Sequence, residues 1–182
     1  MFCAASQIAV GQDFSGKSLS YGLGLGASEG LKHDGLGQHV EVGYKAALWK
    51  DRLRLHPNLT IGAYNTKFIT DVPDSYFNSI NLKMGVEFDL LKIKGFSILI
   101  ETGGFFNLTR GLKGTGGEIP RSGSSFYSYT NYGFELAGGF RVVPKTSRIA
   151  YFIKPWTFLI GPDYFFDFQS TIGIEVSLRK GA

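Results

Sequence analysis

The residues best suited to chemistry are acids and bases that recur at every second position within alternating apolar segments. The polar side of this alternation carries Glu41, Lys45, Lys83, Glu87, Glu101, Glu135, Arg141, Lys154 and Glu175. An unpaired buried charge is costly, so this near balance of acids and bases favours internal ion pairs. Such pairs could form a structural plug, or they could line a narrow, gated path for ions or protons.

Residues for catalysis or metal binding are scarce. The chain has three histidines, His33, His39 and His56, and their spacing matches no metal-ligand motif. No serine accompanies them in a recognisable pattern, and the single cysteine, Cys3, cannot form a multi-cysteine zinc site. We therefore expect no enzyme, no catalytic residues, no metal site and no cofactor.

Period-two alternation of apolar and polar residues is the dominant pattern of the chain and is typical of strands with unlike faces. It covers residues 19–26, 40–48, 52–63, 80–89, 96–103, 131–142, 149–154 and 171–178. Pro57 and Pro155 lie inside two of these segments, where we expect a bulge or a strand end because proline cannot donate to the ladder. No segment has a helical period, and no apolar run reaches the 18 residues of a transmembrane helix.

The connections between these segments alternate in length. Those after the second, fourth and sixth segments are short, whereas residues 28–37, 65–75, 108–124 and 160–167 form longer gaps. Short turns at one end and long loops at the other predict an up-and-down barrel with two unlike ends.

The composition indicates which face of the strands lies outside. Glycine makes up 25 of 182 residues, aromatic residues 15% and charged residues only 19%. Most of the polar faces contain glycine or alanine, which suits the crowded interior of an eight-stranded barrel. The apolar faces carry almost no charge, as a lipid-facing band requires. Aromatic residues near the ends of these faces fit interfacial girdles: Tyr21, Tyr44, Phe88, Phe96, Phe106, Tyr132, Phe140 and Tyr151.

Over residues 18–178 the chain resembles the small eight-stranded outer-membrane barrels, called OmpA-like, OmpX-like or "outer membrane protein beta-barrel domain". The resemblance implies an all-β, eight-stranded antiparallel up-and-down transmembrane β-barrel with short periplasmic turns and long outer loops. It also implies a bacterial outer-membrane location. The chain departs from the family in lacking a C-terminal aromatic residue, since Leu178 is its last apolar position before Arg-Lys-Gly-Ala.

The N-terminal segment differs from the rest of the chain. Residues 1–11 are small and apolar, and Ala9-Val10-Gly11 offers small residues where a signal peptidase reads them. We interpret residues 1–11 as the remnant of an export signal and residues 12–182 as a single β-barrel domain.

The expected function is a structural, adhesive or partner-binding scaffold that works through its outer loops. Candidate loop contacts are Phe126, Tyr127, Tyr129, Tyr164 and Phe165. Expected partners are outer-membrane lipid and, through the loops, lipopolysaccharide, a cell-surface ligand or a subunit of a membrane complex. The positive charge gathers near the short turns, which favours anionic lipid over nucleic acid, and we expect a monomer. Two alternatives stay open: a narrow porin-like channel, and an exported soluble lipocalin-like barrel that binds a small apolar ligand.

Overall fold

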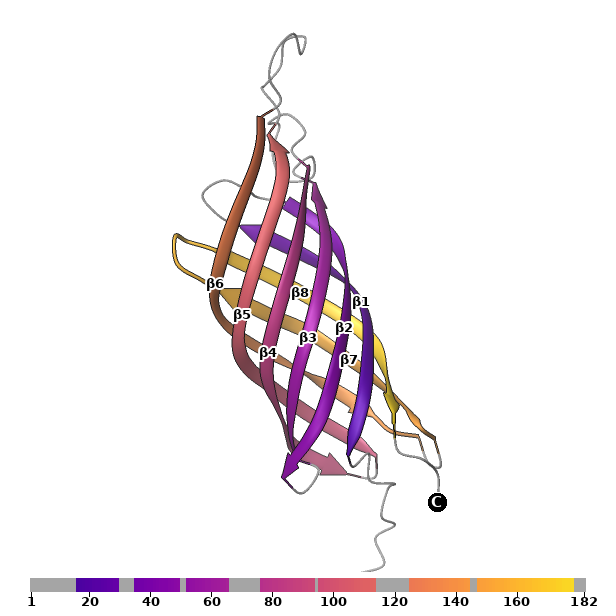
Figure 1. Cartoon of the computed structure of the whole chain (residues 1–182). Helices are drawn as coiled ribbons and strands as arrows, with labels where there is room; N and C mark the ends of the chain where they lie inside the picture. The colour runs from indigo at the N-terminus through magenta and orange to yellow at the C-terminus, as the bar shows by residue number, and fades with distance from the viewer. Residues whose placement is uncertain are drawn as a thin grey trace, which may run out of the picture.

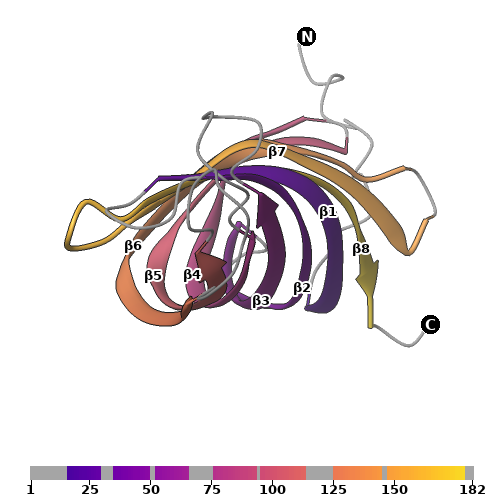
Figure 2. The same ribbon diagram turned by 90° about the horizontal axis from the view of Figure 1, so that it is seen from above.

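Eight antiparallel strands close into a barrel in the computed structural model of the chain (Figure 1). The structure describes residues 16–29, 35–49, 52–65, 76–93, 95–113, 125–144 and 147–178. The strands are β1 (Lys17–Glu29), β2 (Gly35–Trp49), β3 (Leu53–Asn65), β4 (Tyr76–Ile93), β5 (Phe96–Lys113), β6 (Ser125–Val142), β7 (Ile149–Ile160) and β8 (Phe166–Ser177). Each strand pairs with its neighbour in sequence, and β1 pairs with β8 to complete the circle (Figure 2). The predicted all-β up-and-down barrel is confirmed. In the described part of the chain, no helix is long and apolar enough to cross a membrane.

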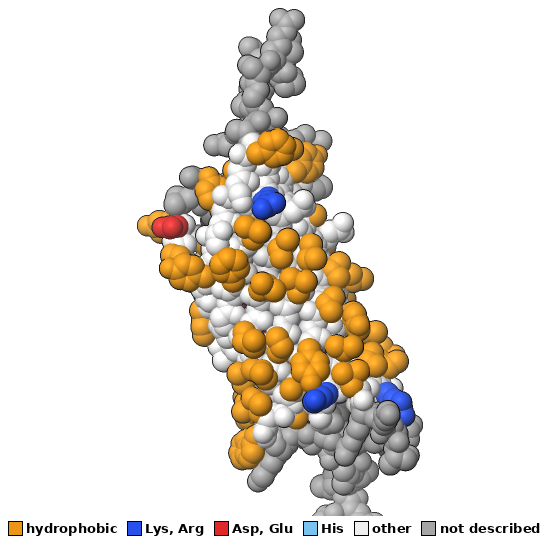
Figure 3. Space-filling view, viewed as in Figure 1, with side chains coloured by type: hydrophobic (Ala, Val, Ile, Leu, Met, Phe, Trp, Pro, Cys, Tyr) orange, Lys and Arg blue, Asp and Glu red, His pale blue; other side chains and the backbone are white. Residues whose placement is uncertain are grey.

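The two faces of the barrel wall have opposite character. One line of cross-strand partners runs around the outer face and is apolar or aromatic throughout. It consists of Val142, Tyr151, Ile174, Tyr21, Val42, Leu59, Leu82, Phe106 and Tyr132. The parallel line one residue away faces inward and includes Arg141, Glu41, Asn81 and Asn107, all buried. Charged and amide side chains therefore fill the interior, while large apolar side chains cover the outside (Figure 3).

The strands are strongly staggered. The outer line leaves β6 at Val142 and returns to β6 at Tyr132, ten positions nearer its start. A closed sheet with such a stagger has strands inclined to the barrel axis. β4, β5 and β6 have 18 residues each, whereas β7 and β8 have 12. The outer ends of β5 and β6 consequently rise above the β7–β8 turn in Figure 1.

Several strands extend further than the alternation predicted. β5 continues to Lys113, so residues 108–113 of the predicted loop 108–124 are strand. β6 begins at Ser125, six residues before the alternation that starts at Asn131. The predicted long connection 160–167 is a turn over residues 161–165, in which Asp163 and Tyr164 adopt positive φ angles of 55° and 60°. Consecutive aromatic residues and glycines interrupt the period-two pattern at these places, although the backbone pairing continues.

The two strand prolines behave differently. Pro155 lies where the β7–β8 register shifts between Lys154 and Thr157, which confirms the predicted irregularity. The prediction for Pro57 was wrong, because Pro57 pairs with Met84 in an unshifted β3–β4 register. A proline lacks only its own backbone N–H donor, and β3 continues past Pro57 without an inserted residue.

Candidate functional site

All nine residues of the predicted charge network lie inside the barrel, and each is buried. The structure brings them together with Arg54, His56 and Asp89 in two groups. The turn-end cluster comprises Lys45, Arg54, Glu87, Asp89, Arg141 and Glu175. The central cluster comprises Glu41, His56, Lys83, Glu101, Glu135 and Lys154.

Glu87 is the hub of the turn-end cluster. Its Oε2 lies 2.5 Å from Lys45 Nζ. Its Oε1 accepts hydrogen bonds from Arg54 Nη1 at 3.1 Å and from Arg141 Nη1 at 2.9 Å. One carboxylate from β4 thus ties together cations from β2, β3 and β6.

Two further acids neutralise the remaining positive charge of the turn-end cluster. Asp89 Oδ2 accepts hydrogen bonds from Arg141 Nη2 and, at 3.4 Å, from Arg54 Nη2. Glu175 Oε2 lies 3.2 Å from Lys45 Nζ. Three bases face three acids, so no net charge is buried in this cluster.

In the central cluster two lysines are shared among three glutamates, and His56 contacts one of these glutamates, Glu101. Lys83 Nζ lies 2.9 Å from Glu41 Oε2 and 3.2 Å from Glu135 Oε1. Lys154 Nζ lies 3.0 Å from Glu41 Oε1 and 2.9 Å from Glu101 Oε2. This alternation of acids and bases links β2, β4, β5, β6 and β7 across the interior.

Phe152 lies between the two clusters, and glycines make room for their side chains. Its ring centroid is 5.3 Å from Lys45 Nζ and 5.7 Å from Lys154 Nζ, within the range of cation–π attraction. A Cβ at Gly85 would lie 2.6 Å from Glu101 Oε1. A side chain at this inward position would therefore force the Glu101 carboxylate to move.

Mostly uncharged side chains fill the half of the lumen toward the long-strand end, where the buried acid Asp167 accepts hydrogen bonds from Tyr64 and Gln169. Asn107 Nδ2 donates to Ser79 Oγ at 2.6 Å and to Asn81 Oδ1 at 2.7 Å. Beyond this polar layer the Tyr64 and Phe77 rings stack with centroids 4.9 Å apart. The interior therefore changes from charged to amide-lined to aromatic along the barrel.

A second aromatic contact lies beside the central cluster. The Phe105 and Phe165 rings have centroids 5.5 Å apart, and both pack with the fully buried Leu159. Phe105 is the cross-strand partner of Lys83, and Leu159 is the cross-strand partner of Glu135.

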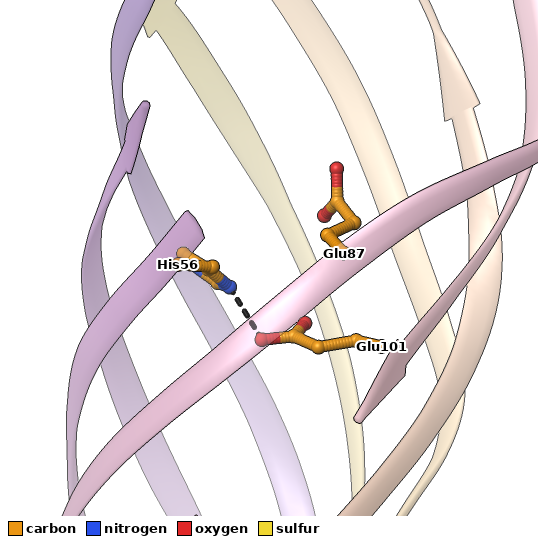
Figure 4. A group of neighbouring side chains, drawn as sticks. All are labelled: His56, Glu87 and Glu101. Atoms are coloured by element: carbon orange, nitrogen blue, oxygen red, sulfur yellow. Dashed lines mark hydrogen bonds and ion pairs between the residues drawn. The ribbon is translucent and has the colours of Figure 1, made fainter. Parts of the chain in front are cut away.

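His56, Glu87 and Glu101 are the group of described residues that comes closest to a metal site (Figure 4). One ligand atom from each lies within 4.8 Å of the others. However, His56 Nδ1 already lies 2.6 Å from Glu101 Oε1, and Glu87 binds three cationic side chains. A metal ion would have to displace these cations, so the donor set favours an ion-pair network.

Sequence reasoning left Arg54, His56 and Asp89 outside the network. Arg54 and His56 share the inward parity of Asn58 on β3, and Asp89 shares that of Glu87 on β4. The alternation therefore assigned these residues to the inward face, but the sequence placed them beside a turn. β3 begins at Leu53 and β4 continues to Ile93, so the side chains lie on strands and point into the lumen.

The candidate loop contacts lie in different environments. Phe126 and Tyr164 are 83% and 84% exposed, whereas Tyr127 and Tyr129 are half-buried on β6 with ring centroids 5.4 Å apart. Phe165 is only 3% exposed and packs inside against Phe105. The prediction that Phe165 offers a loop contact therefore disagrees with the structure, in which its side chain is buried.

The outer part of β6 extends beyond its ladder with β7. Residues Ser125–Gly133 pair with β5, and the β6–β7 register begins at Phe134, opposite Ile160.

Comparison with known proteins shows what this fold is similar to. No protein-family model matches the chain, and no curated protein matches it. Among solved structures, Neisserial surface protein A (NspA) is similar over 90% of this chain and 98% of its own, with a TM-score of 0.64 and 14% identity. Ail, the attachment invasion locus protein of Yersinia pestis, covers 89% of this chain and 98% of its own, with a TM-score of 0.59 and 11% identity. Ail in complex with the heparin analogue sucrose octasulfate gives a TM-score of 0.55. At these identities the similarity shows a shared eight-stranded barrel fold.

Proposed function

We propose that the chain is an integral barrel of the bacterial outer membrane, with a filled lumen and a partner-binding outer end. In this proposal residues 1–11, which lie outside the described part of the chain, are the remnant of an export signal. Residues 12–182 then form one barrel domain that acts as a monomer. Its role is structural and adhesive, without catalysis or a cofactor.

The observation that carries the proposal is the inversion of polarity across the barrel wall. A soluble lipocalin-like barrel would place apolar residues inside and charged residues outside. Here Glu101 and Glu135 are fully buried, while Leu23 and Leu25 are 63% and 71% exposed. Such an apolar outer surface is favourable in contact with lipid and unfavourable in contact with water.

The contents of the lumen support a structural core over a channel. Both charged clusters join strands that are far apart in sequence, and the lumen also holds the Tyr64–Phe77 stack and the Phe105–Phe165 contact. Eight strands leave room only for packed side chains, unlike the wide lumen of larger porins. We therefore rank the narrow porin-like channel second.

The long-strand end supports the binding role. Phe126 and Tyr164 expose large aromatic surfaces there, and β4, β5 and β6 extend this end beyond β7 and β8. Ail is described as an attachment invasion locus protein and has been solved with a heparin analogue. By analogy of fold, we propose that this end contacts lipopolysaccharide, a cell-surface ligand or a subunit of a membrane complex.

Membrane fractionation tests the location of the protein. We expect the full-length product in the outer-membrane fraction, with a band that migrates faster in gels when unheated than when heated. Recovery as a soluble protein without detergent would refute the proposal.

Adhesion of bacteria that display the protein tests the binding role. Cells carrying the wild-type chain should bind immobilised lipopolysaccharide, immobilised heparin or cultured epithelial cells better than cells carrying the empty vector. The Phe126→Ser/Tyr164→Ser variant should lose most of this difference. Leu90→Ser, an exposed position at the opposite end of β4, serves as the control. Equal adhesion with and without the protein on all three surfaces would argue against a binding role.

A further inference from the structure

Asp167 belongs to neither charged cluster, although its side chain is only 1% exposed. Its carboxylate accepts two hydrogen bonds, both at Oδ2: Gln169 Nε2 donates at 3.0 Å and the Tyr64 hydroxyl donates at 3.5 Å. Within the described part of the chain, no lysine, arginine or histidine forms an ion pair with Asp167, and its Oδ1 has no hydrogen-bond partner. A buried carboxylate in such surroundings is costly unless it is neutralised or binds a cation.

The charge balance of the described lumen leads to the same residue. Buried acids outnumber buried lysines and arginines by seven to five. The turn-end cluster is balanced, and in the central cluster His56 is a third base beside two lysines and three glutamates. Asp167 is therefore the acid for which the described lumen supplies no base.

A second oxygen without a partner lies beside Asp167. Gln169 is fully buried, and its amide oxygen Oε1 has no hydrogen-bond partner among the described residues. Because Gln169 Nε2 donates to Asp167 Oδ2, the amide and the carboxylate are held together, and each has one free oxygen. Buried oxygens of this kind imply a bound water or ion. Two of them on adjoining groups, one of which is charged, favour an ion.

Glycines on β1 and β2 let Tyr64 reach this pair from β3. Tyr64 lies opposite Gly37 on β2. Gly37 in turn lies opposite Gly26 on β1, and Gly26 lies opposite Gln169 on β8. A Cβ at Gly26 would lie only 2.9 Å from the Tyr64 hydroxyl oxygen. The tyrosine therefore crosses two strands at residues that have no side chain.

We propose that Asp167 and Gln169 form a cation site in the outer half of the lumen, with the Tyr64 hydroxyl beside it. The ligand is a hard cation of the calcium type, because the donors are oxygens and carboxylate and carbonyl oxygens suit such ions. Water completes the coordination, since Ca²⁺ takes about six to eight oxygen ligands. Asp167 is the second residue of β8, directly after the turn over residues 161–165, so an ion would enter from the outer end.

This group differs in one respect from His56, Glu87 and Glu101. A metal ion there would have to displace cationic side chains, whereas no described cation occupies the Asp167 site. The expectation of no metal site rested on the spacing of the histidines, and no histidine takes part here. The ion would be structural, and its binding requires neither lipid nor a partner at the loops.

Terbium luminescence of the purified protein in an uncharged detergent tests the inference. Tb³⁺ replaces Ca²⁺ at oxygen-ligand sites and emits when a nearby tyrosine is excited. We expect saturable emission at one Tb³⁺ per chain, which Ca²⁺ reverses. Asp167→Asn should weaken binding by about tenfold or more, since even the loss of a supporting group has such an effect at metal sites. Asp163→Asn, in the exposed turn before β8, is the matched control and should bind as the wild type does.

Two further variants separate the position of the ion from its affinity. Gln169→Leu removes the second free oxygen and should also weaken binding. Tyr64→Phe keeps both free oxygens, so Ca²⁺ binding measured by calorimetry should persist while sensitised emission falls, because Tyr64 is the emitter's nearest donor. Ca²⁺ should raise the urea midpoint of the wild type but not that of Asp167→Asn, since a ligand stabilises only the state that binds it.

Three results would overturn the inference. Absence of Tb³⁺ emission that Ca²⁺ can reverse would mean that a proton, water or another segment of the chain satisfies Asp167. Equal binding by the wild type and Asp167→Asn would place the ion at other acids. Unchanged sensitised emission from Tyr64→Phe would place it beside a different tyrosine.

Discussion

Glu101 joins two partners from different strands, because His56 Nδ1 lies 2.6 Å from its Oε1 while Lys154 Nζ lies 2.9 Å from its Oε2. All three side chains are buried. Removing one charge of a buried pair leaves the other uncompensated, at a cost of about 3–5 kcal/mol. We expect Glu101→Gln to lower the free energy of unfolding by about that amount, measured by urea unfolding in lipid vesicles.

A double variant isolates the pairwise part of this effect. Lys154→Met removes the opposing charge, so Glu101→Gln/Lys154→Met should lose less stability than the sum of the two single variants. Glu29→Gln, exposed at the end of β1, should be nearly neutral. A Glu101→Gln protein as stable as the wild type would show that the ion pair contributes little.

Crowding inside the barrel predicts a difference between two glycines. A Cβ at the inward Gly43 would lie 2.6 Å from Ser20 Oγ, whereas one at the outward Gly104 has its nearest neighbour, Gly133 O, at 3.6 Å. We expect Gly43→Ala to cost about 1–3 kcal/mol in unfolding free energy, as overpacking does. Gly104→Ala should be neutral or slightly stabilising. Equal effects would mean that the lumen is not tightly packed at Gly43.

The alternation of side chains was enough to predict the barrel and the inward side of its strands, because the period of a strand fixes which residues share a face. Glu41 and Lys154 could be assigned to one face in this way. Their 3.0 Å contact could not be predicted, since it depends on strand stagger and on the register shift near Pro155. Sequence position alone does not reveal either quantity.

Strand ends were the least predictable feature. The inward residues Asp167 and Gln169 belong to β8, but three successive aromatic residues before Asp167 hid the alternation.

Lipid exposure of the outer face predicts a position-dependent cost for charge. Leu82 lies in the middle of β4 and is 56% exposed, whereas Phe126 lies near the outer end of β6. In lipid vesicles we expect Leu82→Arg to lower folding stability by about 2–4 kcal/mol and Phe126→Arg by about 0–1 kcal/mol. If the outer face met water, both substitutions would be close to neutral, and that result would contradict membrane insertion.

The filled lumen predicts that the protein conducts no ions across a membrane. Planar bilayers that contain the protein should show no stable conductance steps, while a 16-stranded porin in the same bilayers provides the positive control. Regular steps from the wild-type protein would favour the channel alternative.

A double variant locates the barrier. Phe105→Ala/Phe165→Ala removes an aromatic contact beside the central cluster but keeps every charged side chain of both clusters. We expect this variant to stay silent, because Glu87 and Lys154 still tie side chains together across the turn-end and central lumen. If the variant conducts, the Phe105–Phe165 contact is the gate and ions pass the charged clusters, which would contradict a structural plug. If adding Lys154→Met to this double variant then lowered the conductance, the central cluster would line the ion path.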